Sequence, residues 1–179
     1  MKQQILLDMD GVLSDFLSGA LAVLNMKYDR QHTIDSYARS YGQWNTFDFY
    51  GISEEDFWST IERHRRFWIN LDPLPWADKL HKELRKLGDV TIVTSPSLDY
   101  DCASQKLEWL DKHLGVKSNE VFIGSRKYLM AGNGILIDDN KGNCDKFIEA
   151  GGESILVPSN WNTVGLTFQD VMDKIYGRI

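Results

Sequence analysis

The chain has few cysteines, few prolines and no long apolar run. Its 179 residues include two cysteines, Cys102 and Cys144, and four prolines. Two cysteines outside any CxxC pattern give neither a disulfide framework nor a zinc-binding spacing, so we expect free thiols in a reducing compartment. No stretch reaches the ~20 apolar residues of a membrane-spanning helix, and no apolar signal peptide opens the sequence. We therefore expect a cytoplasmic protein with no membrane partner.

Positive charge is also scarce. Twenty Lys and Arg residues stand against 26 Asp and Glu, which gives a formal net charge of −6 and argues against binding to nucleic acid polymers. A small phosphorylated substrate remains compatible, because a bound cation and a single lysine can supply positive potential locally. The length and the 42% hydrophobic content fit one globular core with a sizeable insertion. The sequence leaves the oligomeric state open, a homodimer included.

Strand-like and helix-like segments alternate from residue 76 onward. The helical periodicity predicts amphipathic helices over 76–87 and 100–114, the second with a buried face of Ala103, Leu107, Leu110 and Leu114. The four histidines lie on polar stretches and are expected at the surface. Short apolar strands are expected at residues 5–7, 90–94, 121–123, 135–137 and 155–157. The alternation predicts an α/β fold with a five-stranded parallel sheet.

Residues 17–72 interrupt this alternation. The segment holds 11 of the 21 aromatic residues and reads as helical, with Ser53 as an N-cap and Asp56 three residues later. It lies between the first strand and its crossover helix, and the stretch Asp72-Pro73-Leu74-Pro75 forms a rigid return. We predict an inserted helical cap at 17–72 and a core formed by residues 1–16 and 73–179.

Polar groups follow four successive predicted strands. Because the carboxyl ends of parallel strands meet at one edge of a sheet, we expect these groups to converge there. Gly11 permits a sharp turn, with backbone N–H groups on the side that Asp8 faces. Each group alone could be a cap or a turn; together they point to chemistry on phosphate. The groups are Asp8 and Asp10, then Thr94 and Ser95, then Ser125-Arg126-Lys127, and finally Asp138-Asp139.

This set of motifs resembles the haloacid dehalogenase (HAD) superfamily of aspartyl-phosphate phosphatases. The resemblance covers residues 4–16 and 74–160. Within the superfamily, the chain is similar to the 5′(3′)-deoxyribonucleotidases through Asp-Met-Asp-Gly-Val-Leu-Ser-Asp-Phe, Leu-Asp-Pro-Leu-Pro, Thr-Ser-Pro, Ser-Arg-Lys and Leu-Ile-Asp-Asp. This resemblance implies a three-layer Rossmann-like core with a cap, and Mg²⁺-dependent removal of phosphate from nucleoside monophosphates.

The residue chemistry fits that implication. Asp8 would attack phosphorus and form an aspartyl phosphate, and Asp10 would protonate the leaving group and later deprotonate water. Thr94 and Ser95 would bind the phosphate, with Lys127 beside them; Lys127 is preferred over Arg126 from the resemblance. Mg²⁺ takes oxygen ligands, which Asp8, the Asp10 carbonyl and Asp139 would supply, with Asp138 as a ligand or an orienting group.

Aromatic side chains of the cap are candidates for the nucleobase. Phe16 follows the first motif at a position where the resembling family places a base-contacting phenylalanine, and Trp44, Phe47 and Trp68 are expected in the same pocket. For the tryptophans, the alternative is the core of a small helical cap. Asn160-Trp161-Asn162 is a further candidate for the rim of the pocket.

Two other functions stay open on the sequence. The same chemistry could act on another small phosphometabolite. A phosphoaspartate receiver module also combines an acidic cluster, a hydroxyl group and a lysine on a five-stranded parallel sheet. However, a receiver is expected to carry adjacent acids after its first strand and no long insertion, so the phosphatase is the preferred hypothesis.

Overall fold

The computed structural model describes residues 2–40, 45–132, 134–159, 161–162 and 168–177. Its five strands form one sheet in the order β3-β2-β1-β4-β5, and every neighbouring pair is parallel. The predicted five-stranded parallel sheet is therefore confirmed. The strands are β1 (Gln3–Leu7), β2 (Gly88–Thr94), β3 (Val121–Ile123), β4 (Gly134–Asp138) and β5 (Glu153–Leu156).

Helices cover both faces of the sheet and make three layers. Ile5 and Leu7 of β1 pack in one hydrophobic cluster with α5 and α8, whereas Leu6 between them packs with Phe147 of α7 in another. This alternation follows from the pleat, which sends successive side chains to opposite faces. The helices are α5 (Ala77–Leu87), α6 (Cys102–Leu114), α7 (Lys141–Glu149) and α8 (Phe168–Tyr176), with short 3₁₀ turns at η2 (Ser118–Glu120) and η3 (Lys127–Met130).

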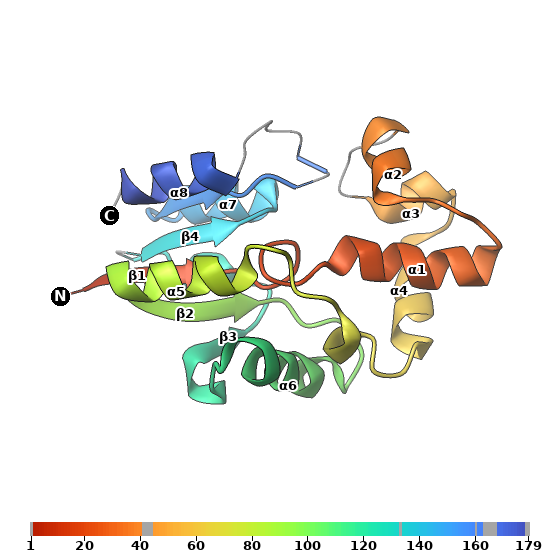
Figure 1. Ribbon diagram of the computed structural model, residues 1–179, viewed down its shortest axis with the longest axis horizontal. Helices are drawn as coiled ribbons and strands as arrows, with labels where there is room; N and C mark the ends of the chain where they lie inside the picture. The colour runs from red at the N-terminus through yellow and green to blue at the C-terminus, as the bar shows by residue number, and fades with distance from the viewer. Residues whose placement is uncertain (1, 41–44, 133, 160, 163–167, 178–179) are drawn as a thin grey trace.

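The inserted segment lies beyond the carboxyl ends of the strands. Figure 1 shows α1 to α4 together on the side toward which the strand arrows point. Its elements are α1 (Phe16–Tyr28), α2 (Ile34–Ser40), α3 (Thr46–Tyr50), α4 (Glu54–Arg63) and η1 (Trp68–Asn70). The Ser53 hydroxyl caps α4 by accepting from the Asp56 backbone N–H, as predicted. This arrangement sets the insertion over the edge where the motifs converge.

The segment that leads from the sheet into the insertion and the segment that returns from it are hydrogen-bonded to each other. The Asp15 N–H donates to the Asp72 carbonyl at 2.8 Å, and the Leu74 N–H donates to the Leu13 carbonyl at 2.8 Å. The indole of Trp76 donates to the Val12 carbonyl at 3.0 Å. These bonds fall at the division proposed between the core and the residue 17–72 cap.

Two expectations about helix faces are wrong. His81 was expected at the surface, but its relative exposure is 4%, and burial lowers its pKa. In α6 the buried face is formed by Cys102, Lys106, Trp109 and Leu110, so the predicted face is shifted by about one position. Leu110 is buried as predicted, whereas Cys102 and Lys106 take the places assigned to Ala103 and Leu107, and Trp109 is buried next to Leu110.

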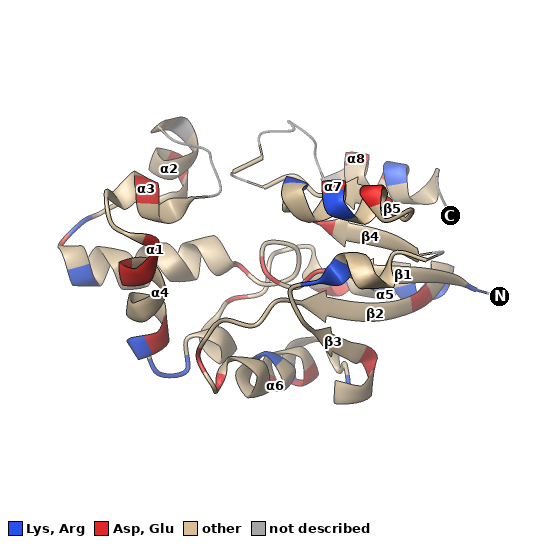
Figure 2. Ribbon diagram, turned by 180° about the vertical axis from the view of Figure 1, so that it is seen from behind, with Lys and Arg blue, Asp and Glu red and all other residues tan. Residues whose placement is uncertain are grey.

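Charged residues are interspersed along the outer helices, as Figure 2 shows for α6 and α4. This pattern differs from the continuous basic stripe that is typical of nucleic-acid-binding proteins. Within the described residues, no helix is both long and apolar enough to cross a membrane.

Candidate active site

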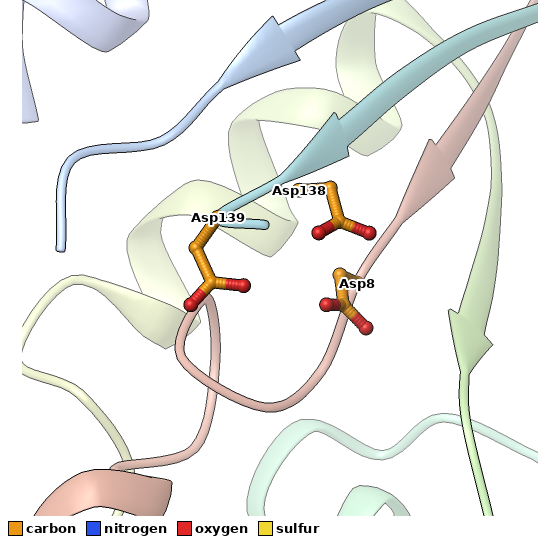
Figure 3. Close-up of side chains that lie close together, drawn as sticks. All are labelled: Asp8, Asp138 and Asp139. Carbon is orange, nitrogen blue, oxygen red and sulfur yellow. The ribbon is translucent and has the colours of Figure 1, made fainter. Parts of the chain in front are cut away.

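Three buried carboxylates meet where β1 and β4 end. Asp8, Asp138 and Asp139 each offer an oxygen such that the three oxygens lie within 4.8 Å of one another. Figure 3 shows the Asp138 carboxylate pointing toward Asp8, with that of Asp139 turned toward the same space. The parallel pairing of β1 with β4 causes this meeting, because it sets Leu7 beside Ile137 and so aligns the following acids.

Lys127 lies between two of these carboxylates. Its ammonium is 2.7 Å from Asp8 Oδ1 and 2.7 Å from Asp138 Oδ2, and the side chain is buried. Burial lowers the pKa of Lys127, but the two carboxylates outweigh burial and raise the pKa overall. Arg126, the competing candidate, is exposed. The η3 turn thus brings Lys127 and not Arg126 into the carboxylate cluster.

Asp138 is occupied by donors on both oxygens. Besides Lys127, it accepts from the Asn140 N–H at 2.8 Å and from the Asn143 amide at 3.1 and 3.2 Å. Asn140 is the N-cap of α7, so the start of that helix fixes the Asp138 side chain. Asn140 and Asn143 were not among the sequence candidates.

Asp139 is the opposite case. It is buried, and its Oδ2 has no hydrogen-bond partner among the described residues. Burial, followed by the charges of Asp138 and Asp8, raises the pKa of Asp139 well above its usual value. Burial together with Asp138 also raises the pKa of Asp8 to about 7, although Lys127 opposes the shift. A cation that accepts oxygen ligands would relieve both carboxylates, so these side chains fit Mg²⁺.

The turn after β1 holds Asp10 beside this cluster. The N–H groups of residues 11–14 bond within the turn, and that of Gly11 donates to the Ser14 carbonyl at 2.9 Å. The expectation that these N–H groups face the site is therefore wrong for residues 11–14. Asp10 is held instead by side chains, with the Ser14 hydroxyl donating to Oδ1 at 3.0 Å and Lys106 paired with Oδ2.

A pocket of about 210 Å³ opens over these groups. One part is polar and the other aromatic, where Phe16 and Trp68 stack at 5.6 Å with an interplanar angle of 17°. Its lining residues are Asp8, Asp10, Phe16, Trp58, Trp68, Ser95, Pro96, Ser97, Lys127, Asp139, Asn140 and Asn143. A second pocket of about 250 Å³ shares Phe16 and Trp58 with the first and is also lined by Phe47 and Trp161.

Most of the sequence candidates converge on these two pockets. Thr94 is fully buried and does not line either one; its hydroxyl accepts from Lys106 at 2.9 Å. Trp44 and Asn160 lie outside the described residues.

Lys106 and Trp58 were missed by sequence reasoning. For Lys106 a signal was present, since a lysine falls within the apolar periodicity of 100–114, three residues after Ala103 and four before Leu110. For Trp58 no signal was present, because nothing in the sequence distinguishes it from an aromatic residue in the core of the cap.

Comparison with known proteins identifies the family. A family model described as 5′ nucleotidase, deoxy (pyrimidine), cytosolic type C protein matches residues 2–172. The human cytosolic 5′(3′)-deoxyribonucleotidase is 30% identical over 140 residues, which cover 76% of this chain and 70% of the relative. The human mitochondrial 5′(3′)-deoxyribonucleotidase is 32% identical over 143 residues, 76% of this chain and 61% of the relative. The 5′(3′)-deoxyribonucleotidase of Bacillus subtilis is 29% identical over 162 residues, 82% of this chain and 81% of the relative.

Solved structures agree on the fold. A haloacid dehalogenase-like hydrolase from Streptococcus pneumoniae aligns with a TM-score of 0.59 at 14% identity, covering 96% of this chain and 90% of that one. The HAD-hydrolase YfnB from Bacillus subtilis, described as bound to magnesium, aligns with a TM-score of 0.59 at 14% identity, covering 99% and 98%. The fold is therefore that of HAD-like hydrolases, and the chain belongs to the deoxyribonucleotidase-type family of phosphoric monoester hydrolases.

Proposed function

We propose that this protein removes phosphate from nucleoside 5′-monophosphates, deoxyribonucleotides among them, through an aspartyl-phosphate intermediate. The observation that carries the proposal is one pocket with two chemically different parts. Asp8, Asp139 and Lys127 line one part, and the rings of Phe16, Trp58 and Trp68 line the other. A phosphate group suits the first part and a nucleobase suits the second, where stacking on an aromatic ring is worth about 1–3 kcal/mol per base.

The chemistry divides between Asp8 and Asp10. A carboxylate oxygen of Asp8 attacks phosphorus, and the bond from phosphorus to the 5′ oxygen breaks while Asp10 gives that oxygen a proton. Asp10 then takes a proton from water as the water attacks the aspartyl phosphate. This second step releases inorganic phosphate and restores the Asp8 carboxylate. Lys127, already 2.7 Å from Asp8, offsets charge on the phosphoryl group as it transfers.

The charge balance of the site supports a requirement for Mg²⁺. Within the described residues, the three clustered carboxylates of Asp8, Asp138 and Asp139 have one ion-pairing ammonium group, that of Lys127. A phosphate dianion would add further negative charge. Mg²⁺ supplies the missing positive charge when it is bound, and Asp8 and Asp139 would hold it, while Asp138 orients Lys127.

Phosphate release from dUMP, dTMP and dGMP, with Mg²⁺ and with EDTA, tests the proposal. We expect turnover that needs Mg²⁺ and is abolished in Asp8→Asn. For Asp10→Asn we expect a loss of roughly 10²–10⁴-fold, the range for a lost proton-transfer group. Asp145→Asn, a change on the exposed side of α7, serves as the control and should keep full activity.

A panel of sugar phosphates and other small phosphate esters separates this function from its main alternative. If a non-nucleotide ester is hydrolysed with a higher kcat/KM than every nucleotide, the nucleotidase proposal fails. Activity that survives in Asp8→Asn would instead contradict the covalent mechanism.

A further inference from the structure

Lys106 is a fully buried lysine in α6, with a relative exposure of 0%. Its ammonium pairs with Asp10 Oδ2 and donates to Thr94 Oγ1 at 2.9 Å and to the Ser95 carbonyl at 2.6 Å. It also lies 4.4 Å from the centroid of the Trp68 ring, within cation–π range. An unpaired buried ammonium is very unfavourable, so this set of partners explains how the protein tolerates the charge.

The partners use every proton that Lys106 can donate. An ammonium has three N–H donors and no acceptor, and here Asp10, Thr94 and Ser95 take one each. No donor remains for a phosphate oxygen, and Lys106 does not line the pocket of about 210 Å³. Lys106 is therefore suited to act through its neighbours and not on the substrate itself.

Asp10 is the neighbour on which this arrangement converges. Ser14 holds one carboxylate oxygen at 3.0 Å and Lys106 holds the other. Thr94, Ser95 and Trp68 in turn fix the position of the ammonium, because they come from the end of β2 and from η1. The Asp10 side chain is 19% exposed at the pocket wall, and without Lys106 the Ser14 hydroxyl would hold one of its two oxygens and leave the other without this partner.

We propose that Lys106 is a positioning residue that holds the Asp10 carboxylate in the orientation needed to protonate the leaving group. This inference rests on the proposed function of Asp10. It makes a prediction about the leaving group, because an alkoxide such as the nucleoside 5′ oxygen needs a proton to depart and p-nitrophenolate does not. The parameter kcat/KM reports this first step, since it includes events up to departure of the leaving group.

The test compares kcat/KM for dUMP and for p-nitrophenyl phosphate in Lys106→Met. We expect a loss of roughly 10²-fold or more with dUMP and of less than about tenfold with p-nitrophenyl phosphate, as for lost proton transfer. Lys112→Met, an exposed lysine of the same helix, is the matched control and should leave both values unchanged. Equal losses with the two substrates would overturn the proposal, because a general disturbance of the site does not depend on the leaving group.

A comparison of Asp10→Asn with Asp10→Asn/Lys106→Met covers the case in which Lys106→Met alone does not fold. The double variant removes both members of the buried pair, which is far less costly than removing one. We expect equal kcat/KM for dUMP in the two proteins, since Lys106 has nothing left to position. A further tenfold loss in the double variant would show a role independent of Asp10 and contradict the proposal.

Urea unfolding gives a readout that does not depend on turnover. It compares the wild type, Lys106→Met, Asp10→Asn and the double variant. Lys106→Met should destabilise the wild-type background much more than the Asp10→Asn background, and equal effects would overturn the inference.

Should the wild type hydrolyse p-nitrophenyl phosphate but no nucleotide, the proposed function fails. Glycerol phosphate, another ester with an alkoxide leaving group, then takes the place of dUMP in the Lys106 test.

Discussion

At the scale of single residues, Gly11 is a position where the backbone decides the geometry of the site. Its φ is +78°, and a Cβ there would lie 2.0 Å from Asp139 Oδ2 and 2.8 Å from the Trp161 ring. Only glycine has both the freedom and the lack of a side chain that this turn requires. Sequence reasoning identified the turn, but the approach of Asp139 depends on the pairing of β1 with β4 and was not visible in the sequence.

Gly11→Ala should therefore impair catalysis and not only stability. Gly51→Ala is the matched control, because Gly51 also has a positive φ, +66°, but among the described residues beyond its chain neighbours no atom lies within 4 Å of its Cβ position. Both variants should lose about 1–2 kcal/mol of unfolding free energy from the left-handed conformation. Gly11→Ala alone should lose on the order of 10²-fold in kcat/KM, the effect of misplacing a catalytic group by about 1 Å. Similar kcat/KM values for the two variants would contradict this account.

At the scale of elements, sequence reasoning found the strands and helices of the core well. Each core strand contains a short apolar run bounded by turn residues, and each core helix ends near a glycine. It failed for the orientation of α6, because periodicity treats lysine as polar and cannot foresee that Asp10, Thr94 and Ser95 will satisfy Lys106. Whether a charged side chain can be buried depends on partners that are remote in sequence, here up to 96 positions away.

The cap of α4 gives an element-scale prediction. The Ser53 hydroxyl accepts from the Asp56 N–H at 3.0 Å and donates to the Asp56 carboxylate at 2.9 Å, and α4 carries the pocket residue Trp58. Ser53→Ala should cost about 1 kcal/mol. For a chain of this size, that corresponds to a fall in Tm of about 2–4 °C. We also expect KM for dUMP to rise more than KM for p-nitrophenyl phosphate, because Trp58 lies in the aromatic part of the pocket.

Ser59→Ala, in the same helix, is the matched control. Alanine has the higher helix propensity at an interior position, so this change should not lower the Tm. If the two serine variants melt at the same temperature, the cap is not contributing to stability.

At the scale of the whole molecule, the site collects groups from the ends of β1, β2 and β4 and from η3. Sequence reasoning could predict this convergence because a single rule, that parallel strands end on the same side, relates residues more than 100 positions apart. It could not predict which ring lies where, because that depends on how α1 and α4 pack. The Phe16–Trp58 contact, with centroids 6.2 Å apart, is one result of that packing.

The same convergence makes the stability of the whole molecule depend on Mg²⁺ and on pH. In EDTA, the raised pKa values of Asp8 and Asp139 mean that the folded state binds more protons than the unfolded state above the usual pKa of about 4. The contribution of these two groups to the stability of the metal-free protein is therefore greatest below that value and decreases as the pH rises toward about 7, the pKa of Asp8. Mg²⁺ at 100 times its Kd should restore about 2.7 kcal/mol.

Asp139→Asn separates these effects, because it removes one charge from the cluster and one ligand from the cation. In EDTA at pH 7.5 the variant should melt higher than the wild type, by about 2–4 °C for each kcal/mol of repulsion that is relieved. Its Tm should also vary less with pH and respond little to Mg²⁺. Asp145→Asn should melt like the wild type in both conditions, since this carboxylate is exposed. A variant that is less stable than the wild type in EDTA, yet still gains stability from Mg²⁺, would mean that Asp139 is not the strained carboxylate at the cation site.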